Sequence, residues 1–168
     1  MWPRLLTLVI SLIDLDHSLM FEHSRLAIDP GIAEEVVKLY KDLDNARGGR
    51  YGTWHSRRIR TNPYPWFDST FDRVAAAVGD LRIDEWWFNC GEPGDEYRWH
   101  SHTPYLWSGV LYIQTPENCG AIEFRQGEAH EIVQPSAGDF LLFPGTLAHR
   151  VLKNLSTDFR ISAAFNFR

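Results

Sequence analysis

The chain is poor in cysteine and has no long basic run, and each of these shortages excludes a class of protein. Its 168 residues contain two cysteines, Cys90 and Cys119. Two are too few for a disulfide framework, and they lie too far apart for a paired zinc or redox motif, so a reducing cytoplasmic location fits best. The formal net charge is -5. Because neutralising phosphates needs clustered lysine and arginine, we expect no nucleic-acid partner.

Long apolar runs are also absent. The longest mainly apolar stretch is short and lies near the start, from Leu5 to Ile13, after Arg4. A membrane-spanning helix needs about 20 apolar residues, so we expect no membrane partner. A charge followed by an apolar run resembles a signal peptide, but no small-residue cleavage site follows. We interpret residues 1–13 as a buried strand, with a processed segment as the alternative.

The composition is that of a folded globular protein. Hydrophobic residues make up 44% of the chain. Aromatic residues make up 14%, and this high share favours a cleft lined by aromatic side chains. The length fits one domain with one core and one site. We expect residues 1–80 to form a supporting part with a loop, and residues 81–168 to form the core that carries the site.

Two helices are predicted in the first half. Asp29 and Pro30 predict an N-cap and a first helical position, and apolar residues then recur at helical spacing until about Asp44. A second helix is predicted from Asp68 to Val78 and ends at Gly79. Residues 45–65, between them, are rich in glycine, proline and arginine, which indicates an irregular loop, a possible functional flap, with one short strand at most.

The second half consists of short β-type runs separated by turn residues. Eight such runs in under 90 residues are typical of an eight-stranded jelly roll, and the fold class is therefore mainly β, with the two helices packed on one outer face. The predicted strands are Arg82–Cys90, Tyr97–His102, Trp107–Gln114, Ala121–Arg125, Glu131–Gln134, Asp139–Phe143, His149–Lys153 and Phe159–Phe167.

Three histidines are the candidate metal ligands. His100 and His102 lie two residues apart on a predicted strand, so both imidazoles point to one face. A His-x-His pair alone is weak evidence. A jelly roll, however, places its second and seventh strands side by side, and this brings His149 to the same place. We therefore predict a metal site formed by the three imidazoles.

Several segments, in this order and spacing, resemble the pattern of the 2-oxoglutarate and Fe(II)-dependent oxygenases, notably a small group with His-x-His. The resemblance covers roughly half of the chain and implies a double-stranded β-helix, Fe(II), O₂ and 2-oxoglutarate as cosubstrate. The segments that carry it are Trp87–Asn89, Pro93–Asp95, Trp99–His102, Ser108–Tyr112, Gly138–Pro144, His149 and Arg160–Ser162.

The ligand set departs from the usual two histidines and one carboxylate of non-haem iron oxygenases, because His102 holds the carboxylate position. Three neutral imidazoles leave an Fe(II) site at +2, which dianionic 2-oxoglutarate would neutralise. The competing assignment is that Asp95 or Glu96 supplies a carboxylate ligand while one histidine only lines the cleft.

The residues expected to bind the cosubstrate lie on the last predicted strand and on neighbouring strands. Arg160 and Ser162 share a face by alternation and can grip a carboxylate, which suits the distal end of 2-oxoglutarate. The resemblance assigns this task to Arg-x-Ser and adds Tyr112 as a further donor. Asn89 is a candidate for the other end of the cosubstrate, and Arg125 is the fallback for Arg160.

The predicted function is an Fe(II)- and 2-oxoglutarate-dependent oxygenase that hydroxylates a small molecule or peptide. One alternative is a cupin-type metal-dependent dioxygenase or isomerase that does not use 2-oxoglutarate. A second is a non-catalytic ligand-binding jelly roll, although a binder needs no convergent imidazoles. Trp99 and Trp107 flank the ligand strand and are candidates for the border of the cleft. The sequence specifies neither the substrate nor the oligomeric state.

Overall fold

The computed structural model describes residues 21–42 and 53–168. The strand predicted for residues 1–13 therefore lies outside the described residues, as does the end of the first predicted helix at Asp44. The elements are β1 (Glu22–Arg25), α1 (Ile32–Asp42), β2 (Trp54–His55), a 3-10 turn (Pro65–Phe67), α2 (Asp68–Ala77), β3 (Ile83–Gly91), β4 (Tyr97–His100), β5 (Trp107–Gln114), β6 (Ile122–Gln126), β7 (Ala129–Val133), β8 (Asp139–Pro144), β9 (Ala148–Val151) and β10 (Arg160–Phe167).

The strands form two antiparallel sheets, which confirms the predicted jelly roll. The larger sheet has the order β1-β8-β5-β10-β3-β2, and the smaller has the order β4-β9-β6-β7. All eight strands predicted in the second half are present, with ends shifted by a few residues. The second and seventh of them, β4 and β9, are neighbours, as the site prediction requires.

Strand alternation divides the apolar side chains of the larger sheet between two cores. On β5, Val110 and Tyr112 face the smaller sheet and pack with Ile122 and Phe124 of β6. Leu111, between them, faces the other side and belongs to a core shared with the helices. The larger sheet is therefore buried on both faces.

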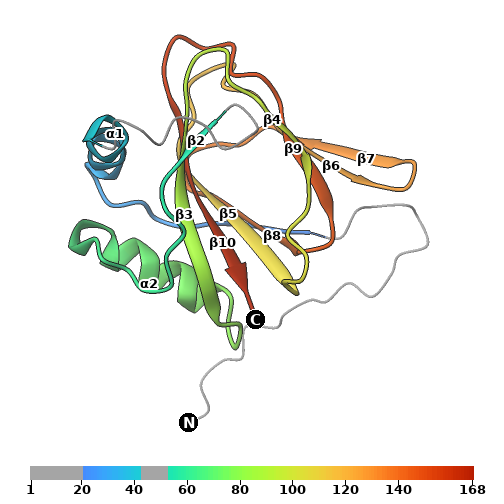
Figure 1. The fold of residues 1–168 in the computed structure, drawn as a ribbon, viewed down its shortest axis with the longest axis horizontal. Helices are drawn as coiled ribbons and strands as arrows, with labels where there is room; N and C mark the ends of the chain where they lie inside the picture. Colours follow the sequence, from blue (N-terminus) through green and yellow to red (C-terminus); the bar gives the residue numbers. More distant parts are fainter. Residues whose placement is uncertain (1–20, 43–52) are drawn as a thin grey trace.

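Both helices cover the outer face of the larger sheet, as predicted, and lie on the side away from β6 and β7 (Figure 1). Ile32 and Val36 of α1 are buried there, and so are Thr70 and Val74 of α2. The helix α2 ends beside Gly79, which has the predicted left-handed backbone with φ of +62°. Among the described residues, no helix is both long and apolar enough to span a bilayer.

The predicted start of the first helix needs a correction. The helix α1 begins at Ile32, three residues after Asp29. The carboxylate of Asp29 accepts hydrogen bonds from Thr70 Oγ1 at 3.0 Å and from Arg73 Nη1 at 2.9 Å, both on α2. Asp29 therefore ties the segment before α1 to α2, a long-range contact that local sequence patterns do not reveal.

Replacing Phe67 tests how the helical layer is attached. The Phe67 ring is fully buried and stacks on Trp86 of β3, with ring centroids 5.1 Å apart. We expect Phe67→Ala to lower the free energy of unfolding by about 3–5 kcal/mol, measured by denaturant titration, because truncation leaves a cavity between helix and sheet. Leu155→Ala, at a side chain that is 73% exposed, is the control and should stay within ~0.5 kcal/mol. Equal losses in both variants would contradict this packing.

Candidate metal centre

Three histidines converge between the two sheets. His100 ends β4 and lies directly opposite His149 of β9 in the strand register. The ring centroids of these two residues are 4.1 Å apart, and the His102 ring is 5.1 Å from each. One potential ligand atom from each residue lies within 4.8 Å of the others, and no other such group occurs in residues 21–42 and 53–168. This spacing suits one metal ion.

His102 reaches the cluster in a way that the alternation argument did not foresee. It was predicted on the strand with His100, but β4 ends at His100 and His102 lies two residues beyond it. The backbone N–H of His102 donates to the Gly145 carbonyl at 2.7 Å, and the N–H of Gly145 donates to the Leu106 carbonyl at 2.9 Å. The loop that carries His102 is thus fixed by the turn after β8.

Hydrogen bonds and burial set the state of the imidazoles. His100 Nδ1 lies 2.8 Å from the Arg98 carbonyl, and His149 Nδ1 lies 3.0 Å from the Leu147 carbonyl. A carbonyl only accepts, so Nδ1 carries the proton and Nε2 keeps its lone pair. Burial lowers the pKa of all three residues, to about 3 for His102 and well below the usual value for His149. Neutral imidazoles are the form that binds metals.

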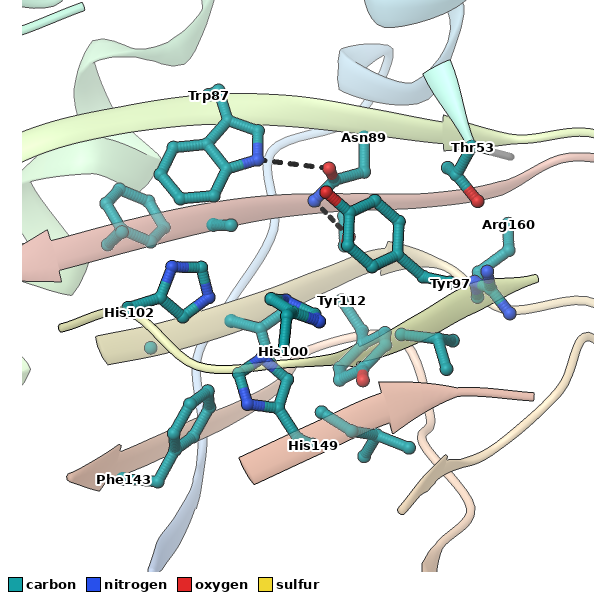
Figure 2. A pocket seen from close by; sticks show the side chains of 17 residues that line it. Thr53, Trp87, Asn89, Tyr97, His100, His102, Tyr112, Phe143, His149 and Arg160 are labelled. Atoms are coloured by element: carbon teal, nitrogen blue, oxygen red, sulfur yellow. Dashed lines mark hydrogen bonds between the residues drawn. The ribbon is translucent and has the colours of Figure 1, made fainter. Parts of the chain in front are cut away.

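The same pocket contains the residues predicted to hold the cosubstrate. Arg160, Ser162, Tyr112 and Asn89 all line it together with the histidines. Figure 2 shows the histidines toward one end and Arg160 at the other, with Tyr112 and Tyr97 between them. The large sheet thus supplies the Arg160 end, and the small sheet with its adjoining loop supplies the histidine end.

Arg160 is a buried cation in an unusual setting. It is 5% exposed, and its Nη1 donates to the carbonyls of Cys119 at 2.6 Å and Leu152 at 3.1 Å. In the part of the chain that the structure describes, no carboxylate forms an ion pair with it. Because a buried charge is costly without a partner, this guanidinium favours an anionic ligand in the pocket.

Three neutral side chains, those of Asn89, Ser162 and Tyr112, lie in the row next to Arg160. Asn89 Nδ2 donates to Ser162 Oγ at 3.2 Å, and Asn89 Oδ1 accepts from Trp87 Nε1 at 3.1 Å. Burial raises the pKa of Tyr112, so its phenol stays protonated and can donate. This end of the pocket therefore combines one cation with hydroxyl and amide groups.

Other candidates lie elsewhere. Asp95 and Glu96 do not line the pocket, and Asp95 Oδ2 accepts from the backbone N–H of Glu92 at 2.9 Å. Arg125 stacks on the Trp99 ring, 4.5 Å from its centroid, and neither residue lines the pocket. Trp107 packs against the core beneath the helices. The expectation that the two tryptophans border the cleft is therefore wrong.

Sequence reasoning missed Thr53, Trp87 and Tyr97 as pocket residues. Trp87 was within reach, because it lies two residues before Asn89 on β3 and shares its face. Tyr97 was not, because an irregularity in the β4–β9 register separates it from His100. Thr53 comes from the segment before β2, which gave no signal of its place beside β3.

Comparisons with known proteins agree with this geometry. The family model described as "Putative 2OG-Fe(II) oxygenase" matches residues 125–166, which include His149, Arg160 and Ser162. No curated protein matches the chain significantly. The resemblance to 2-oxoglutarate and Fe(II)-dependent oxygenases inferred from the sequence is confirmed by this match and by the fold of the solved structures below.

Three solved structures illustrate the shared fold. A prolyl-4-hydroxylase from Pseudomonas putida has a TM-score of 0.66 at 19% identity, over 88% of this chain and 91% of that one. A prolyl hydroxylase from Trichoplax adhaerens, in complex with a hypoxia inducible factor peptide fragment, scores 0.63 at 14% identity, over 88% and 82%. HygX from Streptomyces hygroscopicus, with nickel and 2-oxoglutarate bound, scores 0.60 at 20% identity, over 88% and 81%.

Gly145 offers a test of how the His102 loop is held. A Cβ at this position would lie 2.1 Å from the Tyr105 carbonyl oxygen, so Gly145→Ala must push the loop away from the turn. We expect Fe(II) affinity, measured by anaerobic calorimetry, to fall about tenfold or more, since a displaced ligand binds poorly. Leu106→Ala changes an exposed side chain of the same loop and should bind Fe(II) like wild type. Unchanged affinity in Gly145→Ala would show that the loop does not position a ligand.

Proposed function

We propose that this chain is a non-haem Fe(II)- and 2-oxoglutarate-dependent dioxygenase that hydroxylates a small molecule or a peptide. The observation that carries the proposal is one pocket that joins three convergent, neutral imidazoles to a buried arginine with no carboxylate partner among the described residues. Together they suit a metal ion and a dianionic chelating ligand.

His100, His102 and His149 would hold the iron. The donor set fits, because the potential ligand atoms lie within 4.8 Å of one another, and hydrogen bonds to backbone carbonyls leave the Nε2 lone pairs of His100 and His149 free. Three protein ligands on one face leave positions for a bidentate cosubstrate and O₂. Bound iron supplies the reactivity with O₂ that protein side chains lack.

Arg160 and Ser162 would bind the distal carboxylate of 2-oxoglutarate, with Tyr112 as a further donor. The carbonyls of Cys119 and Leu152 fix Nη1 of the guanidinium, which leaves its other nitrogens for a carboxylate. A guanidinium makes two parallel hydrogen bonds to such a group. Asn89, which lies between Trp87 and Ser162, would bind the cosubstrate from the β3 side.

The comparisons favour the proposed function over the two alternatives. HygX has been crystallised with nickel and 2-oxoglutarate, and the Trichoplax adhaerens enzyme with a peptide fragment. A cupin-type dioxygenase or isomerase would use the same histidines but has no need of Arg160 as an anion site. A non-catalytic binding protein would need neither the three histidines nor Arg160. Affinity for 2-oxoglutarate therefore separates the three.

Replacing Arg160 tests the cosubstrate site. In the Mn(II)-loaded protein, Arg160→Ala should keep the metal but lose 2-oxoglutarate affinity by about 2–5 kcal/mol, because it removes one partner of a desolvated charge pair. Arg160→Lys should recover only part of this, since an ammonium lacks the two-point contact. Arg125→Ala, outside the pocket, is the control, and calorimetry is the measurement.

Two outcomes would count against this assignment. If Arg160→Ala binds 2-oxoglutarate as tightly as wild type, the anchor lies elsewhere. If the Mn(II)-loaded wild type shows no affinity for 2-oxoglutarate, the cupin-type alternative takes its place.

Replacing His102 tests the ligand set. We expect His102→Asp to preserve Fe(II) binding, since it restores two histidines and one carboxylate, and His102→Ala to weaken it by more than the roughly 10- to 100-fold cost of losing an outer-shell partner. Anaerobic calorimetry measures both. Asp95→Asn is the control and should bind Fe(II) normally. Weak binding in Asp95→Asn, with normal binding in His102→Ala, would instead identify Asp95 as the ligand.

A further inference from the structure

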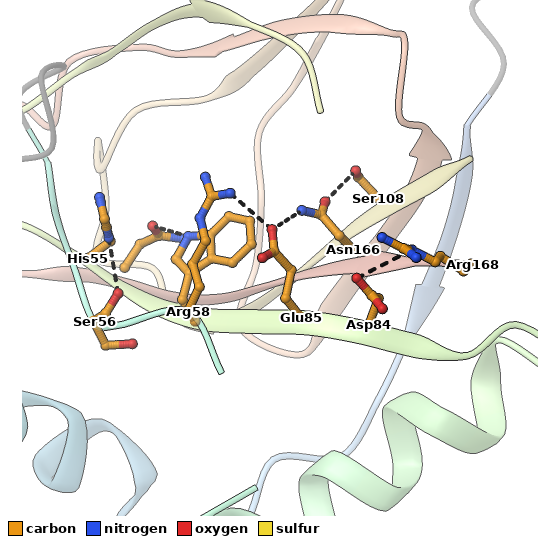
Figure 3. A network of polar contacts seen from close by, with 10 residues as sticks. His55, Ser56, Arg58, Asp84, Glu85, Ser108, Asn166 and Arg168 are labelled. Atoms are coloured by element: carbon orange, nitrogen blue, oxygen red, sulfur yellow. Dashed lines mark hydrogen bonds and ion pairs between the residues drawn. The ribbon is translucent and has the colours of Figure 1, made fainter. Parts of the chain in front are cut away.

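A polar cluster lies behind the pocket lining, next to Trp87, and has no part in the function proposed above. It consists of Arg58, Glu85, Asn166 and Ser108 (Figure 3). Arg58 Nη1 and Asn166 Nδ2 both donate to Glu85 Oε1 at 2.9 Å. Ser108 Oγ donates to Asn166 Oδ1 at 2.8 Å. These hydrogen bonds connect three strands of the large sheet to the segment that follows β2.

The strand register fixes where this cluster lies relative to Arg160. Cross-strand partners form rows on the inner face of the large sheet, and each row is two residues, or roughly 7 Å, from the next. The rows, in order, are Gly91–Arg160, then Asn89–Ser162–Tyr112, then Trp87–Ala164–Val110, then Glu85–Asn166–Ser108.

The histidines face the last two of these rows. The Trp87 ring lies 5.7 Å from that of His102, and Phe143, the partner of Ser108, lies 4.8 Å from His149. With 2-oxoglutarate between Arg160 and the histidines, the part of the pocket left for the primary substrate is beside Trp87.

Backbone pairing on both sides of Arg58 holds it in place. Ile59 and Trp86 exchange two backbone hydrogen bonds, at 3.0 and 2.9 Å, and the N–H of Ser56 donates to the Phe88 carbonyl at 2.9 Å. Ser56 Oγ also accepts from the N–H of Phe88 at 3.0 Å. Arg58 is thus part of an ordered edge segment along β3, from which its side chain reaches the Trp87 ring.

The Arg58 guanidinium retains donors for a ligand. Its carbon lies 4.5 Å from the centroid of the Trp87 ring, and Trp87 lines the pocket. The side chain is 50% exposed. Within residues 21–42 and 53–168, its one hydrogen-bonded nitrogen is Nη1. Nε and Nη2 remain available, which is enough for a two-point contact with a carboxylate.

The charges around the pocket also favour an anion. No carboxylate is among the residues that line it. In the proposed complex the Fe(II) and 2-oxoglutarate charges cancel, so the metal end of the pocket has no net negative charge that would repel a carboxylate.

We propose that Arg58, stacked on Trp87, binds the carboxylate of the primary substrate, and that this substrate is therefore a small carboxylic acid. The proposal rests on the function proposed above and narrows its substrate class. Glu85 is a positioning residue, because it accepts from Nη1 and so orients the remaining donors of Arg58, and Asn166 in turn holds Glu85 by donating to the same Oε1. The substrate's reactive carbon would then lie between Arg58 and the histidines.

The test compares binding of carboxylates and matched amides by the protein loaded with Mn(II) and 2-oxoglutarate. The probes are the twenty common amino acids in free and N-acetylated form, each beside its C-terminal amide. A thermal-shift screen selects ligands, and calorimetry measures their affinities. The variants are Arg58→Gln, Arg58→Lys and, as the matched control, Arg57→Gln at the exposed neighbouring arginine. Affinity for 2-oxoglutarate is measured separately in every variant.

We expect at least one carboxylate to bind wild type at least tenfold more tightly than its amide. Arg58→Gln should lose this preference while keeping 2-oxoglutarate affinity within twofold, Arg58→Lys should recover part of it, and Arg57→Gln should behave like wild type. An equal affinity for acid and amide, an unchanged preference in Arg58→Gln, or no carboxylate bound by wild type would each overturn the proposal. If wild type shows no affinity for 2-oxoglutarate, that result would instead contradict the proposed function.

Discussion

The antiparallel pairing of β4 with β9 places His100 directly opposite His149, although 48 residues lie between them in the sequence. Side chains of a strand alternate between faces, so a register shift of one residue would turn one of these imidazoles away from the other. The β4–β9 pair lies at one edge of the small sheet, and β6 holds β9 from the other side through four residue pairs. The metal site thus depends on a register that the whole small sheet maintains.

The two sheets contribute different parts of the pocket. The small sheet and the loop after β4 provide the imidazoles, whereas the inner face of the large sheet provides a series of rows that begins at Arg160 and reaches Trp87 and Ala164. Helices cover the outer face of the large sheet, and among the described residues the core beneath them contributes only Phe165 to the pocket lining.

Much of the fold was predictable because its signals are local. Period-2 patterns and turn residues identified all eight strands of the second half, and Gly79 marked the end of α2. What failed depended on contacts distant in sequence. Asp29 bonds with α2 rather than capping α1, and β1 exists as a strand because it pairs with β8.

In the site, too, local sequence signals predict some positions, and contacts distant in sequence determine the others. That His100, His149, Arg160 and Ser162 line one pocket could be predicted from types and spacing, since alternation and strand order determine which face each residue occupies. The position of His102 depends instead on a hydrogen bond to Gly145 in a turn more than 40 residues away. Tyr97 and Thr53 depend on a register irregularity and on an edge segment. Neither feature has a signature within a window of neighbouring residues.

The choice of histidine at position 102 links the metal to the substrate through charge. A carboxylate ligand would leave the proposed Fe(II) and 2-oxoglutarate complex at -1, whereas three neutral imidazoles leave it at zero. A negative centre would repel a second carboxylate, and this repulsion is strong in a buried site where water screens little. A neutral centre removes it, which agrees with the proposal that Arg58, stacked on the Trp87 ring, binds the carboxylate of the substrate. The third imidazole and the exposed arginine thus act in the same direction, and both favour a substrate of negative charge.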